Sequence, residues 1–166
     1  MTKVEVRKAS VTEYRGELIA VCHFEDARKL EGAALELDRA SGGILGDLLK
    51  HGDFTGKHAQ VSVVYTRGAL PVRRVLLLGL GKKKECDLEK LRRGFSKASR
   101  SVRELGIGEF AIRLDLIGKS HSLEDLTEAV IEGVLLGLYR FTQFKSVDKD
   151  GAKDIRKLHL LAASDQ

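Results

Sequence analysis

The fold of this chain is decided by residues 74–105, which read RVLLLGLGKKKECDLEKLRRGFSKASRSVREL. The stretch opens with an aliphatic run that predicts a strand over residues 73–78. Because that run is apolar on both faces, we expect a central strand covered on both sides. Asp87 is a good N-cap for a helix over residues 88–105, since its carboxylate can accept a backbone N–H of the first turn. A buried strand and an amphipathic helix joined by a short corner therefore form the centre of the expected domain.

The remaining elements extend this pattern in both directions. Alternating or β-branched runs predict further strands, and apolar residues at helical spacing predict further helices. Residues 32–37 are compatible with either a helix or a strand. Strands alternate with helices from the middle of the chain onward, which favours an α/β layered domain with a mixed, largely parallel sheet. The expected strands are 4–6, 17–24, 60–65, 109–116 and 155–161, and the expected helices are 44–50 and 123–144, the latter capped by Ser122.

Composition restricts the class of protein. The 166 residues favour one domain, and 43% hydrophobic with 32% charged residues fit a folded rather than a disordered chain. The apolar runs are far too short to span a bilayer, so no membrane partner is expected. The first residues lack the apolar core of a signal peptide, and Cys22 and Cys86 show no metal-site or redox spacing. We therefore expect a cytoplasmic, reduced protein.

The excess positive charge is confined to one segment. The net charge is +5, and residues 82–104 carry nine basic and four acidic residues, so the rest of the chain is balanced. On the helix, the basic side chains occupy the arc opposite the apolar stripe. This arc is either a solvated face or a surface that contacts nucleic-acid phosphates without sequence preference. Its candidate residues are Lys90, Arg92, Arg93, Lys97, Arg100 and Arg103.

The corner Gly79-Leu80-Gly81 also has two interpretations. A strand, a glycine turn, lysines and a helix start can form a phosphate or ADP-ribose site, or an ordinary strand-to-helix turn. A dinucleotide fingerprint needs a third glycine where this chain has Lys84, and the Ser or Thr of a P-loop lysine motif is missing. The five histidines are scattered, and no carboxylate pair or nucleophile–base arrangement stands out. The residues by themselves indicate no catalytic, cofactor-binding or metal-binding site.

Several ordered segments together resemble the amino-terminal domain of the leucyl aminopeptidase (cytosol aminopeptidase) family. No single motif is specific, but the order and separation of the set are similar across most of the chain. The segments are Gly42-Gly43 with Leu48-Leu49, the DFTGK run at 53–57, RVLLLGLGK at 74–82, AVIEGVLLGLY at 129–139 and RFTQFK at 140–145.

The resemblance implies a macro-domain-like, three-layer α/β fold with helices on both faces of the sheet. It also implies a parent enzyme that releases amino-terminal residues from peptides with two divalent metal ions, zinc or manganese. In that family the metal ligands lie in a separate carboxy-terminal domain, whose signature segments do not occur here. We therefore expect residues 1–166 to be one non-catalytic domain for assembly or regulation. The partners implied are the catalytic domain, a homo-hexamer and, in some members, DNA.

Overall fold

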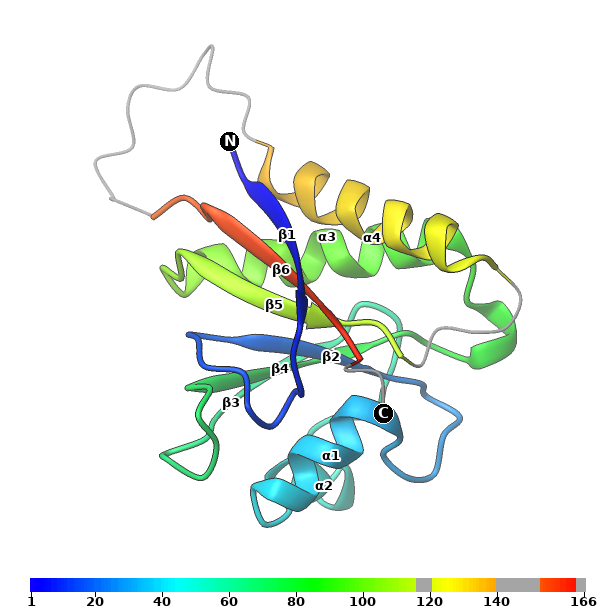
Figure 1. Cartoon of the computed structure of the whole chain (residues 1–166). Helices are drawn as coiled ribbons and strands as arrows, with labels where there is room; N and C mark the ends of the chain where they lie inside the picture. The colour runs from blue at the N-terminus through cyan, green and yellow to red at the C-terminus, as the bar shows by residue number, and fades with distance from the viewer. Residues whose placement is uncertain (116–120, 140–152, 164–166) are drawn as a thin grey trace.

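The computed structural model of the chain describes residues 1–115, 121–139 and 153–163. Within them, six strands form one sheet in the order β1-β6-β5-β2-β4-β3 (Figure 1). No helix among these residues is long and apolar enough to cross a membrane. The strands are β1 (Lys3–Lys8), β2 (Ile19–His23), β3 (Val61–Tyr65), β4 (Arg74–Gly79), β5 (Glu109–Arg113) and β6 (Lys157–Ala162). The helices are α1 (Gly32–Ala40), α2 (Ile44–Lys50), the short 3-10 turn η1 (Lys83–Glu85), α3 (Leu88–Glu104) and α4 (Leu123–Leu138).

The sheet is parallel except at one edge. Strands β1, β6, β5, β2 and β4 run in the same direction, and β3 pairs with β4 in the antiparallel sense. In the pairing of β2 with β4, Ile19 lies opposite Val75 and His23 opposite Gly79. Strand β4 therefore has a neighbour on each side and is buried along residues 75–79, as its sequence predicts. The mixed, largely parallel sheet expected from the sequence is confirmed.

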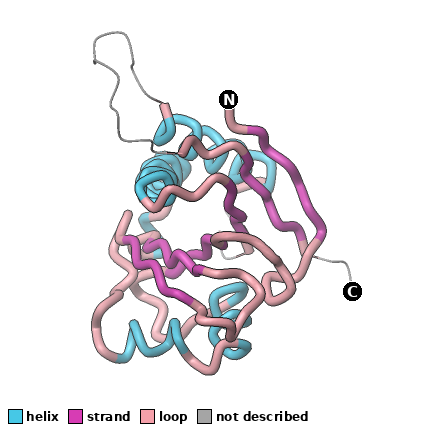
Figure 2. Tube along the Cα trace, turned by 90° about the vertical axis from the view of Figure 1, so that its left-hand side faces the viewer, coloured by secondary structure: helices cyan, strands magenta, loops and turns pink. Residues whose placement is uncertain are grey.

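Helices cover both faces of the sheet, so the fold has three layers (Figures 1 and 2). Successive side chains of a strand point to opposite faces, and on β4 Leu76 and Leu78 join the core beneath α3 and α4. Val75 and Leu77 join the other core, which α1 and α2 cover. This alternation explains why the run 75–78 is apolar throughout: both of its faces are buried.

Helices α3 and α4 pack closely because two glycines of α4 face α3. A Cβ atom at Gly133 would lie 2.5 Å from the carbonyl oxygen of Arg92, and one at Gly137 would lie 2.4 Å from that of Ser96. Real Cβ atoms are not found at such distances, so only glycine permits this separation of the helices. The pairs also show that α3 and α4 run side by side in the same direction.

The helix boundaries follow local hydrogen bonds, with one correction. Asp87 accepts the N–H of Lys90 at 2.7 Å, and Ser122 accepts the N–H of Asp125 at 3.1 Å, which confirms both predicted caps. The ambiguous segment at 32–37 is helical as part of α1. Helix α4 ends at Leu138, short of the predicted end near residue 144, and residues 140–144 lie outside the described residues. The guanidinium of Arg103 donates to the last carbonyls of α4 and so stabilises this end.

Candidate functional site

The glycine corner after β4 has its backbone donors occupied by the chain itself. The N–H of Gly79 donates to Gln60 at 2.8 Å, and the N–H of Leu80 donates to His23 at 3.0 Å. The N–H of Gly81 donates to the carbonyl of Gly56 at 2.9 Å. A phosphate cradle needs such groups to point at the ligand. These three hydrogen bonds favour the alternative interpretation, an ordinary strand-to-helix turn.

Close packing explains why this corner contains glycine. A Cβ atom at Gly79 would lie 2.1 Å from the carbonyl oxygen of Lys57, so the loop before β3 fills the space beside it. Gly81 has φ +73°, a conformation that side chains rarely adopt. Both glycines therefore serve the contact between the 56–58 loop and the end of β4. Asp26 accepts the N–H of Lys83 at 3.1 Å, which uses a further donor of the corner.

Half of the predicted basic surface is paired with carboxylates. Lys90 lies 3.5 Å from Glu85, and Arg93 forms an i,i+4 pair with Glu89 at 3.0 Å. Arg92 forms an ion pair with Glu132 of α4, and this contact raises the pKa of the guanidinium. The pair joins the two helices, and the sequence does not show it because Glu132 lies on another element.

The remaining three candidates differ among themselves. Arg103 donates to the carbonyls of Gly137 and Leu138 at 3.3 and 3.4 Å, which is a structural role at the end of α4. Arg100 is exposed, and its guanidinium donates to the carbonyl and hydroxyl oxygens of Ser96. Lys97 is exposed, and its ammonium group forms no ion pair or hydrogen bond in the described part of the chain. The nucleic-acid surface stays a prediction, and the cations free to serve it are chiefly Lys97 and Arg100.

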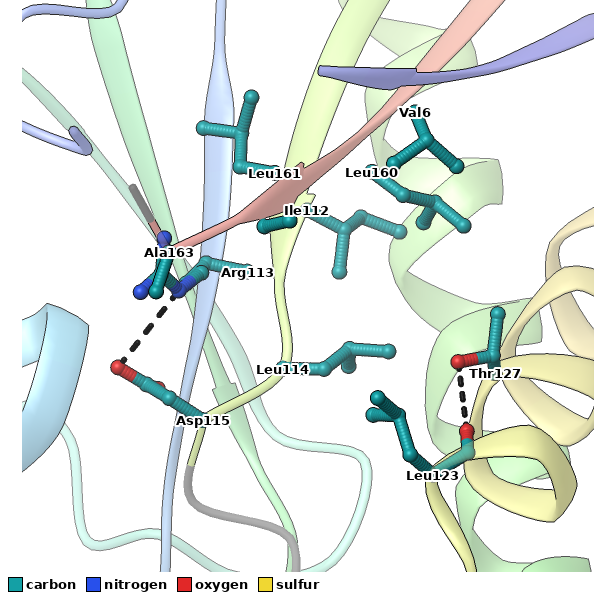
Figure 3. Close-up of a pocket in the computed structure, with 11 residues that line it drawn as sticks. Val6, Ile112, Arg113, Leu114, Asp115, Leu123, Thr127, Leu160, Leu161 and Ala163 are labelled. Atoms are coloured by element: carbon teal, nitrogen blue, oxygen red, sulfur yellow. Dashed lines mark hydrogen bonds and ion pairs between the residues drawn. The ribbon is translucent and has the colours of Figure 1, made fainter. Parts of the chain in front are cut away.

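An apolar cavity of about 370 Å³ lies at the carboxyl ends of β5 and β6 (Figure 3). In parallel α/β sheets, ligands bind outside these strand ends, where neighbouring connections pass to opposite faces. Here the connections change face between the neighbouring strands β2 and β5, because α1 follows β2 on one face and α4 follows β5 on the other. The cavity lies beside this point, on the β6 side of β5. Sequence reasoning missed this cavity, because it depends on which strands are neighbours. Its lining includes Val6, Ile112, Leu114, Leu123, Leu160 and Leu161.

One carboxylate borders the cavity. Asp115 follows β5 directly, and its Oδ2 accepts the N–H of Ala33, in the first turn of α1, at 2.8 Å. The same oxygen lies 3.9 Å from Nε of Arg113 (Figure 3). Asp115 therefore occupies the anion position at the start of α1, which Glu31 does not cap with its side chain. The polar end of the cavity is a carboxylate that already has a cationic neighbour and a backbone donor.

A second titratable cluster centres on a buried histidine of the sheet. His159 is 1% exposed and lies between two glutamates of the neighbouring strands. Its Nδ1 is 3.6 Å from an oxygen of Glu5 on β1, and its Nε2 is 3.5 Å from one of Glu109 on β5. The two carboxylates lie on the strands either side of β6 and face different nitrogens of the ring. Among the described residues, no group of three or more His, Cys, Asp or Glu side chains is placed to hold a metal ion.

Comparison with known proteins decides the family. Residues 20–148 match the model of the N-terminal domain of the cytosol aminopeptidase family. The chain belongs to the cytosol aminopeptidase family. A probable cytosol aminopeptidase of Geobacter sp. (strain M21) is 35% identical over 161 residues, which are 96% of this chain and 32% of the relative. The chain thus spans about a third of the length of such curated relatives, and the resemblance read from the sequence is confirmed.

Solved structures confirm the fold of this family domain. A tomato leucine aminopeptidase mutant superposes with a TM-score of 0.79 at 20% identity, over the whole of this chain and 33% of that one. A Trypanosoma brucei macrodomain in complex with ADP-ribose gives a TM-score of 0.69 at 16% identity, over 96% of this chain and 64% of that one. At these identities the likeness concerns the fold alone. The predicted macro-domain-like architecture is therefore confirmed.

Proposed function

We propose that these 166 residues are the assembly and regulatory domain of a cytoplasmic, metal-dependent leucyl aminopeptidase, and that they have no peptidase activity alone. The observation that carries the proposal is the match of residues 20–148 to the family's N-terminal domain. The chain corresponds to about a third of its curated relatives, which leaves room in those proteins for a catalytic domain. The parent enzyme would release amino-terminal residues from peptides.

The division of labour follows from the chemistry of a two-metal hydrolase. Two divalent ions polarise the scissile carbonyl and supply a hydroxide nucleophile, and they require a convergent set of carboxylate or imidazole ligands. We place that set, and the zinc or manganese ions, in a separate carboxy-terminal domain of the parent enzyme. The present domain would bind that domain and contribute to a homo-oligomer, a hexamer by analogy with the family.

Hydrolysis of leucine amide tests this proposal. The 166-residue chain, saturated with Mn²⁺ or Zn²⁺, should release no ammonia above the metal-only control. The same chain continued into a catalytic domain of the family should turn the substrate over. Metal-dependent turnover by the 166 residues alone would refute the assignment, because it would require a metal centre within them.

The cavity beyond β5 and β6 favours a second candidate function, the binding of ADP-ribose. A cavity of about 370 Å³ lies within the usual range for small-molecule sites, and its apolar walls suit a nucleobase. This proposal moves the ligand away from the glycine corner, whose N–H groups are occupied. Titration calorimetry with ADP-ribose should show heat that Leu123→Asp abolishes, because Leu123 is exposed and lines the cavity. Absence of heat at millimolar ligand would exclude it.

A further inference from the structure

The outer surface of α3 and α4 carries opposite charges at its two ends. The helices run in the same direction, with Arg92 beside Gly133 and Ser96 beside Gly137. Charges on α3 and α4 can therefore be placed along one common axis (Figure 1). The end near the start of α4 is acidic, and the end near Leu138 is basic. Such a gradient makes the surface complementary to itself when it is turned end for end.

The basic end is a groove between the two helices. Arg93, Lys97 and Arg100 of α3 line it, and Leu136 of α4 forms the opposite wall. Leu136 is 66% exposed, and Tyr139 close by is 73% exposed. The ammonium group of Lys97 forms no ion pair or hydrogen bond with another described residue. Arg93 is paired with Glu89, whereas Lys97 and Arg100 form no ion pair with a described carboxylate. An exposed apolar side chain beside these two cations suits an acidic segment with an exposed apolar residue.

The acidic end provides such a segment. Glu124 and Glu128 lie one turn apart on α4 and line a shallow groove with Leu123 and Ile131. Leu123 is 71% exposed. Neither Glu124 nor Glu128 forms an ion pair with another described residue. The acidic end therefore combines two unpaired carboxylates with an exposed leucine, which complements the basic end in both charge and apolar surface.

We propose that this surface binds a second copy of the chain across a two-fold axis. Glu124 and Glu128 of each copy would face Lys97 and Arg100 of the other, an isologous contact in which both pairings form at once. The centres of the two patches are separated by about 13 residues of helix, or about 20 Å at 1.5 Å per residue. A two-fold axis perpendicular to the surface at the level of Glu132 lies midway between the two patches. It places each patch of one copy against the oppositely charged patch of the other. The inference rests on the proposed assembly role and specifies which surface performs it.

The size of the surface sets the strength of the contact. Each helix is about 25 Å long at 1.5 Å per residue, and two neighbouring helices present a strip about 20 Å wide. The footprint is therefore about 500 Å² per copy, less than the roughly 800 Å² of a stable interface. We expect a weak, reversible dimer that depends on salt, because its charges remain near solvent and are screened within about 10 Å at 0.1 M salt.

Sedimentation velocity with charge reversal tests the proposal. The chain should show a monomer–dimer equilibrium at 50 mM NaCl that weakens at 500 mM. Lys97→Glu with Arg100→Glu should weaken dimerisation at least tenfold, and so should Glu124→Lys with Glu128→Lys. An equimolar mixture of the two double variants should associate again as a heterodimer, because each end then meets an opposite charge. All four residues are exposed, and unchanged thermal melts would show that the variants remain folded.

The outcomes separate this inference from its rivals. A wild-type chain that stays monomeric at high concentration in low salt would overturn it. Variants that lose association without recovery in the mixture would also overturn it, and would indicate another acidic partner. If the Lys97 and Arg100 reversals abolish binding to duplex DNA but leave self-association unchanged, the surface serves nucleic acid instead. Turnover of leucine amide by the chain would refute the proposed function and leave the sedimentation result unaffected.

Discussion

Replacing Gly133 with alanine tests how closely α3 and α4 must pack. The added Cβ would lie 2.5 Å from the carbonyl oxygen of Arg92 and 2.9 Å from its Cα. Both are backbone atoms of α3, so no side chain can rotate to make room. Helix α4 must move outward by up to about 1 Å to reach ordinary contact distance, which loosens Val130 and Val134 in the core beneath it.

The expected cost follows from two opposing effects. Overpacking of this kind costs about 1–3 kcal/mol, whereas alanine in a helix interior is favoured over glycine by up to about 1 kcal/mol. We expect Gly133→Ala to lower the free energy of unfolding by about 1–2 kcal/mol. Gly94→Ala in α3 is the matched control, because its Cβ would meet Leu78 at an ordinary 3.6 Å. That variant should be stabilised by about 0.5–1 kcal/mol.

Urea unfolding followed by circular dichroism measures both changes in the free energy of unfolding. We expect the two variants to have equal m-values. For a domain of this size, the difference of about 2 kcal/mol between the two variants corresponds to about 4–8 °C in melting temperature. Gly133→Ala combined with Gly137→Ala should cost less than the sum of the single variants, because the first displacement of α4 relieves part of the second clash. A Gly133→Ala protein as stable as Gly94→Ala would refute the reasoning, since α4 would then not be held by this contact.

Three further perturbations test local interactions. Burial raises the pKa of Tyr14 to about 12, whereas tyrosine in the unfolded chain has a pKa of about 10. The contribution of Tyr14 to the free energy of unfolding should therefore be fully present below pH 10 and be lost as the pH rises toward 12. In alkaline unfolding, Tyr14→Phe should not show this loss. Burial raises the pKa of both thiols, and Cys22 is the more deeply buried. Iodoacetamide at pH 8 should therefore alkylate Cys86 before Cys22, and equal alkylation rates would contradict this prediction. Asp38 accepts the N–H of Leu45 at 2.9 Å at the start of α2. In urea unfolding, Asp38→Ala should lower the free energy of unfolding by about 1 kcal/mol, and Asp38→Asn should lower it much less, because an amide oxygen can still accept this bond. Equal losses would show that this hydrogen bond is not responsible.

Features of the fold that depend on neighbours in the sequence were predictable. The caps at Asp87 and Ser122 are bonds between residues three apart, so the local pattern is sufficient to identify them. The central position of β4 follows from its uninterrupted apolar run. The predicted end of α4 was wrong: the helix ends at Leu138, where Tyr139 adopts extended backbone angles, and Arg103 of α3 donates to its last carbonyls.

The candidate sites depend instead on contacts between residues that are distant in the sequence. The glycine corner is closed by hydrogen bonds to Gly56 and Gln60, and the sequence gives no sign that their loop lies against it. The basic arc of α3 was correctly placed by helical periodicity. Its division into paired and free cations depends on Glu132, whose position is set by the packing of α4. The cavity beyond β5 and β6 exists only because those strands are neighbours in the sheet.

The sequence by itself determined the type and order of most elements, the capped starts of α3 and α4, and the family of the domain. These depend on backbone propensity, side-chain periodicity and ordered segments, all of which are properties of the chain read in one dimension. The tertiary structure decided the order of the strands, the closure of the corner after β4 and the charges left free on α3. Each of these depends on contacts between residues distant in sequence, where burial and hydrogen-bond geometry determine which groups remain available for a partner.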